Sequence, residues 1–228
     1  MRYCQSFIIF TVLKLNLLSL FILFVTLLYS VAAFASTDSV TTRRHPMAYS
    51  GFQGGMMVNV GYGFSGRYAL YDADGQMLEQ LSPAGVPVGM GGALRVNFGK
   101  HLRVGGAGYV STMNYGGNGS YSRIGWGGVL ADSKWDIDRW TLFVGGMFGG
   151  GTARHLNIIN DEHDEFQVAR SSFREYPFLA FDPFFGAEYA MTHKIHLVFQ
   201  VDYIVNITAR RDDFVQGPRF FLGFMFCH

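Results

Sequence analysis

The strongest constraint in this sequence is a two-residue alternation of apolar and polar side chains. It is clearest over residues 195–207, IHLVFQVDYIVNI. Successive side chains of a β-strand point to opposite faces. One face of this segment therefore carries only Ile, Leu, Phe, Val and Tyr, and the other carries His196, Gln200, Asp202 and Asn206. Because strands of soluble sheets commonly have about five or six residues, the segment predicts an unusually long strand with two unlike faces.

The same alternation recurs along the chain and predicts eight strands, over residues 52–64, 86–98, 102–114, 121–132, 139–149, 176–191, 195–207 and 217–226. The connections alternate in length. Those at 99–101, 133–138 and 193–194 are turns, whereas those at 65–84, 115–120, 150–174 and 208–216 are longer loops. Long alternating strands in even number, with turns at one end and loops at the other, are typical of transmembrane β-barrels. We therefore predict an all-β fold, an antiparallel up-and-down transmembrane β-barrel of eight strands. A count of ten remains open if residues 66–82 form two further spanning strands.

The composition agrees with strands in an apolar setting. Charged residues make up 15% of the chain, against roughly 25% in soluble domains. The aromatic residues, at 16%, and the other apolar residues exclude a disordered chain. The 29 glycines follow no three-residue period, which excludes a collagen-like chain. With 18 basic and 17 acidic residues, the chain has no electrostatic footprint for nucleic acid.

The first 35 residues are predicted to be a signal peptide. They contain an uncharged run from Leu15 that ends in Ala33-Phe34-Ala35, an A-x-A cleavage pattern. A membrane anchor is the alternative, because about 20 apolar residues can cross a bilayer as a helix. Residues 36–51 are a polar lead-in, and residues 52–228 are the predicted barrel. With Cys4 in the leader and Cys227 near the end, no disulfide is expected.

The chain resembles the small eight-stranded outer-membrane proteins of Gram-negative bacteria, in the class of outer-membrane protein X and the protein A barrel. The outer-membrane protein W class is a looser relative. The resemblance covers about residues 52–228 and rests on architecture rather than on motifs. It includes a last strand with Phe220, Leu222, Phe224 and Phe226 in register, although Cys227-His228 extends beyond the usual terminal Phe. It implies an integral protein of the outer membrane whose loops face outside.

Polar side chains on the inward faces are the most informative candidate site. By register, the predicted lumen charge network consists of Arg95, Arg103, Arg123, Arg139, Asp182, Glu188, His196, Asp202 and Arg219. Unpaired charges in a closed interior are costly, so they must pair or be hydrated. We expect Glu188 to balance Arg95, Arg103 and Arg139. An ion-pair plug that fills the lumen is favoured over a narrow polar pathway.

The loops hold three candidate chemical sites, each with a simpler structural interpretation. Residues 161–165, DEHDE, offer oxygen ligands for a cation, but also suit a solvated acidic loop. Residues 72–75, DADG, resemble a calcium loop, but the flanking alternation favours a hairpin turned by Asp-Gly. His155 with Ser171 or Ser172 has no motif spacing that would hold a base and a nucleophile together. We predict no metal site, no cofactor and no enzymatic activity.

Three functional hypotheses follow. The first is a structural or surface-interaction barrel that contacts extracellular ligands through loops 65–84 and 150–174. The second is a narrow channel or small-molecule transporter, and the third is a lipid A-modifying enzyme. The expected partners are outer-membrane lipid and an external ligand, with no nucleic acid, and the barrel is expected to be a monomer.

Overall fold

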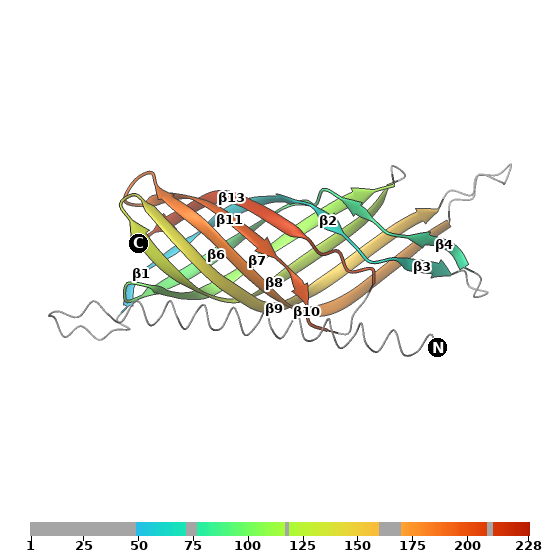
Figure 1. Cartoon of the computed structure of the whole chain (residues 1–228), viewed down its shortest axis with the longest axis horizontal. Coiled ribbons are helices and arrows are strands. Elements are labelled where there is room, and N and C mark those ends of the chain that lie inside the picture. Colours follow the sequence, from blue (N-terminus) through green and yellow to red (C-terminus); the bar gives the residue numbers. More distant parts are fainter. Residues whose placement is uncertain (1–48, 72–76, 117–118, 160–169, 209–211) are drawn as a thin grey trace, which may run out of the picture. The chain divides into compact units, whose positions relative to one another are not determined.

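Eight antiparallel strands pair with their neighbours around a closed ring (Figure 1). The computed structural model describes residues 49–71, 77–116, 119–159, 170–208 and 212–228. Around the ring the order is β1, β6, β7, β8, β9, β10, β11 and β13, and β13 pairs again with β1. The predicted eight-stranded up-and-down barrel is confirmed. No helix in the described part of the chain is long and apolar enough to cross a membrane.

The ring strands are β1 (Tyr49–Gly61), β6 (Val88–Phe98), β7 (Leu102–Tyr115), β8 (Ser120–Ile137), β9 (Trp140–Ile159), β10 (Arg170–Ala190), β11 (Ile195–Tyr203) and β13 (Pro218–Cys227). β12 (Val205–Asn206) continues β11 and also pairs with β10. Both Gln53↔Cys227 and Phe52↔Val96 are register pairs of β1. The start of β1 and the end of β13 therefore lie at the same end of the barrel as the turns, which face the periplasm in barrels of this kind.

The two faces of the ring differ in chemistry as the alternation predicts. On β13, Phe220, Leu222 and Phe224 expose 43%, 51% and 47% of their surface, whereas the intervening Arg219 and Phe221 expose 2% each. The outward faces of the other strands are apolar as well, and include exposed Met56, Met90, Val129, Phe148, Phe185 and Phe199. An apolar band around the outside of a closed barrel is suited to lipid. The barrel therefore crosses the membrane with its polar face inward.

A separate hairpin interrupts the connection between β1 and β6. Here β2 (Gly63–Phe64) pairs with β5 (Ala84–Gly85), and β3 (Tyr68–Tyr71) pairs with β4 (Met77–Leu81). The two longer strands form a sheet of their own outside the ring, so the ten-strand alternative is wrong. In Figure 1 this hairpin lies at the same end as the tips of β9 and β10.

The strands β8, β9 and β10 extend well beyond the membrane. They contain 18, 20 and 21 residues, whereas about 9–11 residues suffice to cross a bilayer. The predicted loop 150–174 is therefore largely a strand pair, since β9 and β10 stay in register as far as Ile159↔Arg170. The alternation of faces continues there, with Ala153, His155 and Asn157 inward. Because both faces carry polar residues, the sequence pattern predicted a loop instead of two strands.

Two strand boundaries in the structure differ from the predicted ones. β1 begins at Tyr49, so the last residues of the predicted lead-in 36–51 belong to the barrel. β8 continues to Ile137, so its turn to β9 is Asp138-Arg139 rather than 133–138, and Asp138 has a φ of 54°. The predicted signal peptide, residues 1–35, lies outside the described residues.

Close approach of neighbouring strands makes glycine necessary at inward positions. A Cβ added to Gly128 would lie 2.3 Å from the backbone oxygen of Phe148, whereas one added to the outward-facing Gly125 would lie 3.5 Å from Val110 Cγ2. We expect Gly128→Ala to lower the free energy of unfolding by about 1–3 kcal/mol, typical of overpacking. Gly125→Ala, on the same strand, is the matched control and should change it little. Equal urea midpoints of the two variants in detergent would contradict this account of the inward glycines.

Candidate functional site

Four charged side chains form a compact group near the turn end of the lumen, which we call the arginine cluster. It contains Arg95 from β6, Arg103 from β7, Asp132 from β8 and Glu188 from β10, each at most 3% exposed. Glu188 lies 3.3 Å from Arg95 and 2.6 Å from Arg103. Asp132 lies 3.1 Å from Arg95 and also pairs with Arg103. Two positive charges thus face two negative charges, which is the balance that a buried group requires.

Neutral side chains complete the arginine cluster. Gln53 donates to Glu188 over 3.2 Å, and Arg95 donates to Gln200 over 2.9 Å. The ring of Phe143 lies 4.9 Å from the guanidinium carbons of both Arg95 and Arg103. Together, the charged and neutral side chains of this group come from seven different strands. They tie opposite walls of the barrel together and fill its interior at this level.

A second charged group lies nearer the middle of the lumen. Arg219 donates to the Tyr109 hydroxyl over 2.6 Å. Asp182 and Asp202 are 1% and 2% exposed and lie close enough to interact with each other and with Arg219. The Asp182 carboxylate accepts a hydrogen bond from the backbone of Tyr203, where the pairing of β10 passes from β11 to β12. One arginine therefore faces two carboxylates.

This middle group is incompletely paired. Among the described residues, both carboxylate oxygens of Asp202, one of Asp182 and the Nε of Arg219 have no hydrogen-bond partner. The side chains of Asn59 and Ser111, both buried, also have no hydrogen-bond partner there. Buried polar groups are normally hydrogen-bonded. Among the described residues, the middle of the lumen therefore has more buried polar atoms without a hydrogen-bond partner than the arginine cluster has.

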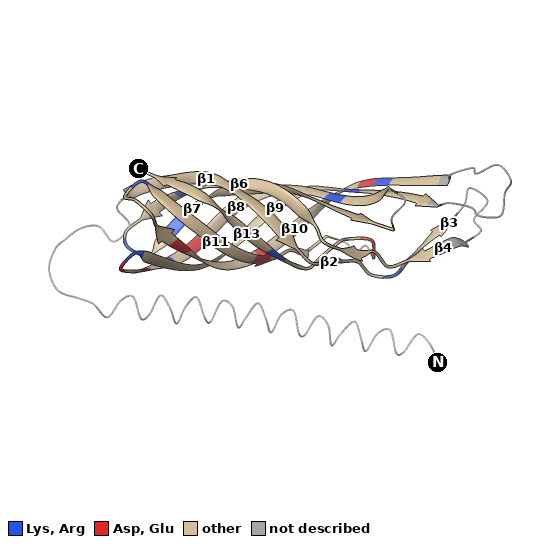
Figure 2. Ribbon diagram, turned by 90° about the horizontal axis from the view of Figure 1, so that it is seen from above, with Lys and Arg blue, Asp and Glu red and all other residues tan. Residues whose placement is uncertain are grey.

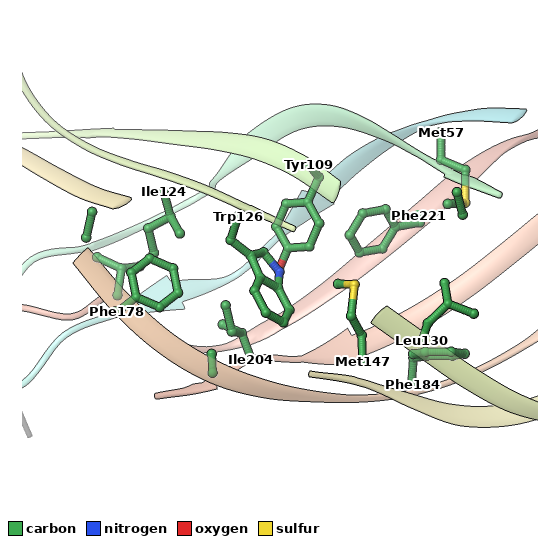
Figure 3. Packing of buried hydrophobic residues seen from close by; sticks show 14 of the residues in the cluster. Met57, Tyr109, Ile124, Trp126, Leu130, Met147, Phe178, Phe184, Ile204 and Phe221 are labelled. Carbon is green, nitrogen blue, oxygen red and sulfur yellow. The ribbon is translucent and has the colours of Figure 1, made fainter. Parts of the chain in front are cut away.

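Large apolar side chains fill the space between these polar groups (Figure 3). Trp126 packs against Tyr109 and Phe178, with ring centroids 6.3 and 6.5 Å apart, and Tyr109 contacts Phe221 at 5.3 Å. Met147, Leu130 and Phe184 continue the packing towards the turn end. Residues that meet from opposite walls in this way close an eight-stranded barrel to solvent.

Residues 212–217 fold onto the long-loop end of the lumen and are called the cap. The backbones of Phe64 and Gln216 exchange two hydrogen bonds, of 2.9 and 3.0 Å. Phe214 and Val215 are 5% and 3% exposed, and the Phe214 ring lies 5.0 Å from that of Phe178. The cap thereby extends the hydrophobic cluster of the lumen.

A hydrogen-bonded group anchors the cap to the extended strands. Tyr176 donates to Asp213 over 3.0 Å, and Arg174 lies 3.4 Å from the same carboxylate. The Nε2 of His155 lies 3.3 Å from the Tyr176 hydroxyl, and the two rings stack. Close by, the hydroxyls of Tyr68 and Tyr115 both donate to Asn157, over 3.1 and 2.6 Å. These bonds join the β3–β4 hairpin, β7, β9, β10 and the cap.

The structure brings together most, but not all, of the residues predicted to line the lumen. Arg95, Arg103, Glu188 and His196 meet near the turn end, where His196 lies 3.5 Å from Glu188, and Asp182, Asp202 and Arg219 meet in the middle. Arg139 is exposed because it lies in the β8–β9 turn, so its predicted place in the lumen is wrong. Arg123 is also exposed, so its prediction is wrong too. Figure 2 shows charged residues both at the turn end and on the extended strands.

The error at Arg123 and the absence of Asp132 from the prediction have one cause. The inward residues of β8 are Ser122, Ile124, Trp126, Leu130 and Asp132. The prediction of Arg123 as an inward residue shifts this strand by one residue and places Trp126 and Asp132 outward. A one-residue shift moves every side chain to the other face. The correct signal was Asp132 itself, because the shifted register places an unpaired carboxylate on the lipid face.

The three candidate sites predicted in the loops lie only in part within the residues that the structure describes. Residues 161–165 and 72–75 lie outside the described residues. Within those that are described, no group of three or more His, Cys, Asp or Glu side chains is placed to hold a metal ion. His155 is buried and contacts Tyr176, whereas Ser171 is exposed. Ser172 lies opposite Asn157 in the register, and the contact described for His155 is with Tyr176 rather than with either serine.

The arginine cluster should make Glu188 important for stability. We expect Glu188→Gln to lower the free energy of unfolding by an amount near the lower end of the roughly 3–5 kcal/mol typical of a broken buried pair, because Asp132 still faces both arginines. Glu175→Gln is the control, since Glu175 pairs with Arg154 at a half-exposed site, where such pairs contribute about 0–1 kcal/mol. Urea unfolding in detergent compares the two. Similar midpoints would contradict a closed, ion-paired lumen.

His155, outside the membrane, should make stability depend on pH. Burial lowers the pKa of His155, against the opposing charge of Asp213. The folded chain then binds fewer protons than the unfolded chain, so the free energy of unfolding falls as the pH drops below about 6.5. We expect wild type to lose more stability than His155→Gln between pH 7.5 and pH 5. Parallel urea midpoints over this range would show that His155 is not the group responsible.

No protein-family model matches the chain, and no curated protein matches it in sequence. Similar solved structures include outer membrane protein OprG from Pseudomonas aeruginosa, 10% identical with a TM-score of 0.46, covering 80% of this chain and 98% of that one. Neisserial surface protein A is 16% identical with a TM-score of 0.45, covering 78% and 98%. Ail of Yersinia pestis, in complex with the heparin analogue sucrose octasulfate, is 15% identical with a TM-score of 0.41, covering 77% and 99%.

The closed ring and its apolar outer face support a location in the outer membrane by themselves. The chain is an integral outer-membrane β-barrel.

Proposed function

We propose that this protein is a non-conducting outer-membrane barrel that holds a rigid extracellular platform for contact with an external ligand. The platform consists of the parts of β8, β9 and β10 that extend beyond the membrane, together with the β3–β4 hairpin and the cap. The observation that carries the proposal is the contrast between a lumen filled with side chains and strands of 18–21 residues that continue past the bilayer.

The contacts in the lumen favour support over transport. The arginine cluster and the neutral side chains around it join seven strands, and Tyr109, Trp126 and Phe221 meet in the middle of the barrel. Among the described residues, apolar packing and paired charges alternate along the lumen, which disfavours a continuous polar path for a solute. The cap adds Phe214 and Val215 at the long-loop end.

The contacts beyond the membrane favour a preorganised binding surface. Hydrogen bonds from Tyr68, Tyr115 and Tyr176 connect separate elements of the platform. A surface that is rigid before binding loses less conformational freedom when its ligand binds. Outer-membrane barrels with mobile loops lack this advantage.

A narrow channel is the second candidate, and one observation favours it. The unpaired polar atoms of Asn59, Ser111 and Asp202 in the middle of the lumen would suit water or an ion. A channel would need the arginine cluster and the cap to open together.

Conductance separates these two functions. We expect the purified barrel in planar lipid bilayers to give no discrete current steps, because side chains fill the lumen at several levels. Glu188→Gln provides the comparison, since it weakens the plug at the turn end. Reproducible steps from the wild-type protein would contradict the non-conducting barrel and favour the channel.

Truncation of the platform tests the surface role. The variant replaces residues 157–172 with a short turn that joins Leu156 to Phe173, a register pair of β9 and β10. In a deletion strain, we expect the truncated variant to fold in the outer membrane like wild type, which heat-dependent gel mobility checks, but not to restore the attachment of whole cells to matrix-coated surfaces. Wild type should restore that attachment. If the truncated variant restores attachment fully, or if neither protein affects attachment, the platform is not the functional surface.

A further inference from the structure

Two arginines stand side by side on the outer surface of the barrel. Arg123 on β8 and Arg154 on β9 are cross-strand partners, and both are exposed on the outward face. Like charges directly opposite each other destabilise a sheet. Arg154 also pairs with Glu175 over 2.9 Å, but none of the described carboxylates pairs with Arg123. The site therefore has a net positive charge and guanidinium donors that remain free.

The position of the pair along the barrel matches the headgroup layer of the outer leaflet. Trp140, 51% exposed, packs with Tyr189 at the turn end, as in the aromatic girdle at a membrane interface. With a rise of ~3.3 Å per residue and a tilt of about 40°, Arg154 lies about 35 Å further along the barrel axis. The apolar band of such barrels is about 25 Å tall. Arg123 and Arg154 are therefore about 10 Å above it, in the polar layer.

The outward surface directly beneath the arginines is almost free of side chains. Below Arg123 on β8 come Gly125 and Gly127, and below Arg154 on β9 come Thr152 and Gly150. We call these four residues the small-residue patch. Exposed Val129 and Phe148 mark its lower edge. Packing inside the barrel does not explain Gly125, because an added Cβ would only touch Val110 at 3.5 Å.

We propose that Arg123 and Arg154 bind a phosphate group of an outer-leaflet glycolipid, with an acyl chain of that lipid lying against the small-residue patch. Charge complementarity selects the phosphate, because paired guanidinium groups bind it through several charge-assisted hydrogen bonds. Thr112, the cross-strand partner of Arg123 on β7, adds a hydroxyl beside the arginines. A second copy of the chain on this face is disfavoured, since a two-fold interface would bring four arginines together. The inference does not depend on the proposed function.

The test measures binding of diphosphorylated lipid A to the refolded barrel in detergent by native mass spectrometry. We expect Arg123→Gln/Arg154→Gln to weaken binding by at least about tenfold, as expected for lost charge-assisted hydrogen bonds. Arg139→Gln, which removes an exposed arginine at the opposite end, is the matched control and should bind like wild type. Gly125→Leu should weaken binding severalfold without touching the arginines. Heat-dependent gel mobility confirms that each variant is folded.

Two further probes identify the ligand chemistry. Wild type should bind dephosphorylated lipid A about as weakly as the double variant binds the phosphorylated form. Inorganic phosphate at millimolar concentration should not displace lipid A, because it lacks the acyl chain that contacts the patch. The proposal is overturned if the folded double variant binds lipid A like wild type, if Arg139→Gln weakens binding equally, or if inorganic phosphate alone competes.

Discussion

The need to pair every backbone polar group in hydrocarbon governs this structure. No water is available in the bilayer core to replace a missing partner, so a sheet can cross only if it closes. Closure occurs where β13 pairs with β1, from Gln53↔Cys227 to Gly61↔Arg219, and with β11 on its other side. Once the ring is closed, side chains of one parity face lipid and those of the other face a narrow lumen. The inversion of polarity and the filled interior both follow from this constraint.

The lumen then has to accommodate charges in a small, poorly hydrated space. At the turn end, two positive charges are neutralised by two negative charges, because Arg95 and Arg103 each pair with both Asp132 and Glu188. In the middle of the lumen the charges are incompletely paired, because Arg219 donates to Tyr109 and the carboxylate of Asp202 has no hydrogen-bond partner among the described residues. The two ion pairs of Glu188 also join β10 to β6 and β7, which are distant from it around the ring. The same contacts that neutralise the lumen therefore hold the register of the barrel, which a hydrated channel would not require.

Outside the membrane, backbone groups no longer have to pair within the sheet, and the pattern of polar residues on the strands differs. Water can satisfy the edges of β9 and β10, so the strands need not close, and polar residues occur on both of their faces. Internal order there depends on hydrogen bonds such as Tyr176 to Asp213 and Tyr115 to Asn157. On the outer surface, Arg123 and Arg154 lie above the apolar band, in the polar layer. The position of a residue relative to the bilayer thus decides whether a charge is paired inside or available to a partner outside.

The sequence alone determined the barrel and the orientation of most strands, because alternation against lipid is a strong local pattern. It favoured eight strands, and the tertiary structure excluded ten by placing β3 and β4 in a sheet of their own. The sequence also identified Glu188, Arg95 and Arg103 as inward charges. The register of β8 was ambiguous in the sequence, since glycines such as Gly125, Gly127 and Gly128 carry no polarity and Trp126 suits either face, and Asp132 was the one signal of the correct register. The lengths of β9 and β10 were equally hidden, because outside the membrane both faces are polar. Only the tertiary structure placed Asp132 between two arginines and Arg123 beside Arg154, because both placements depend on which residue of a neighbouring strand lies opposite.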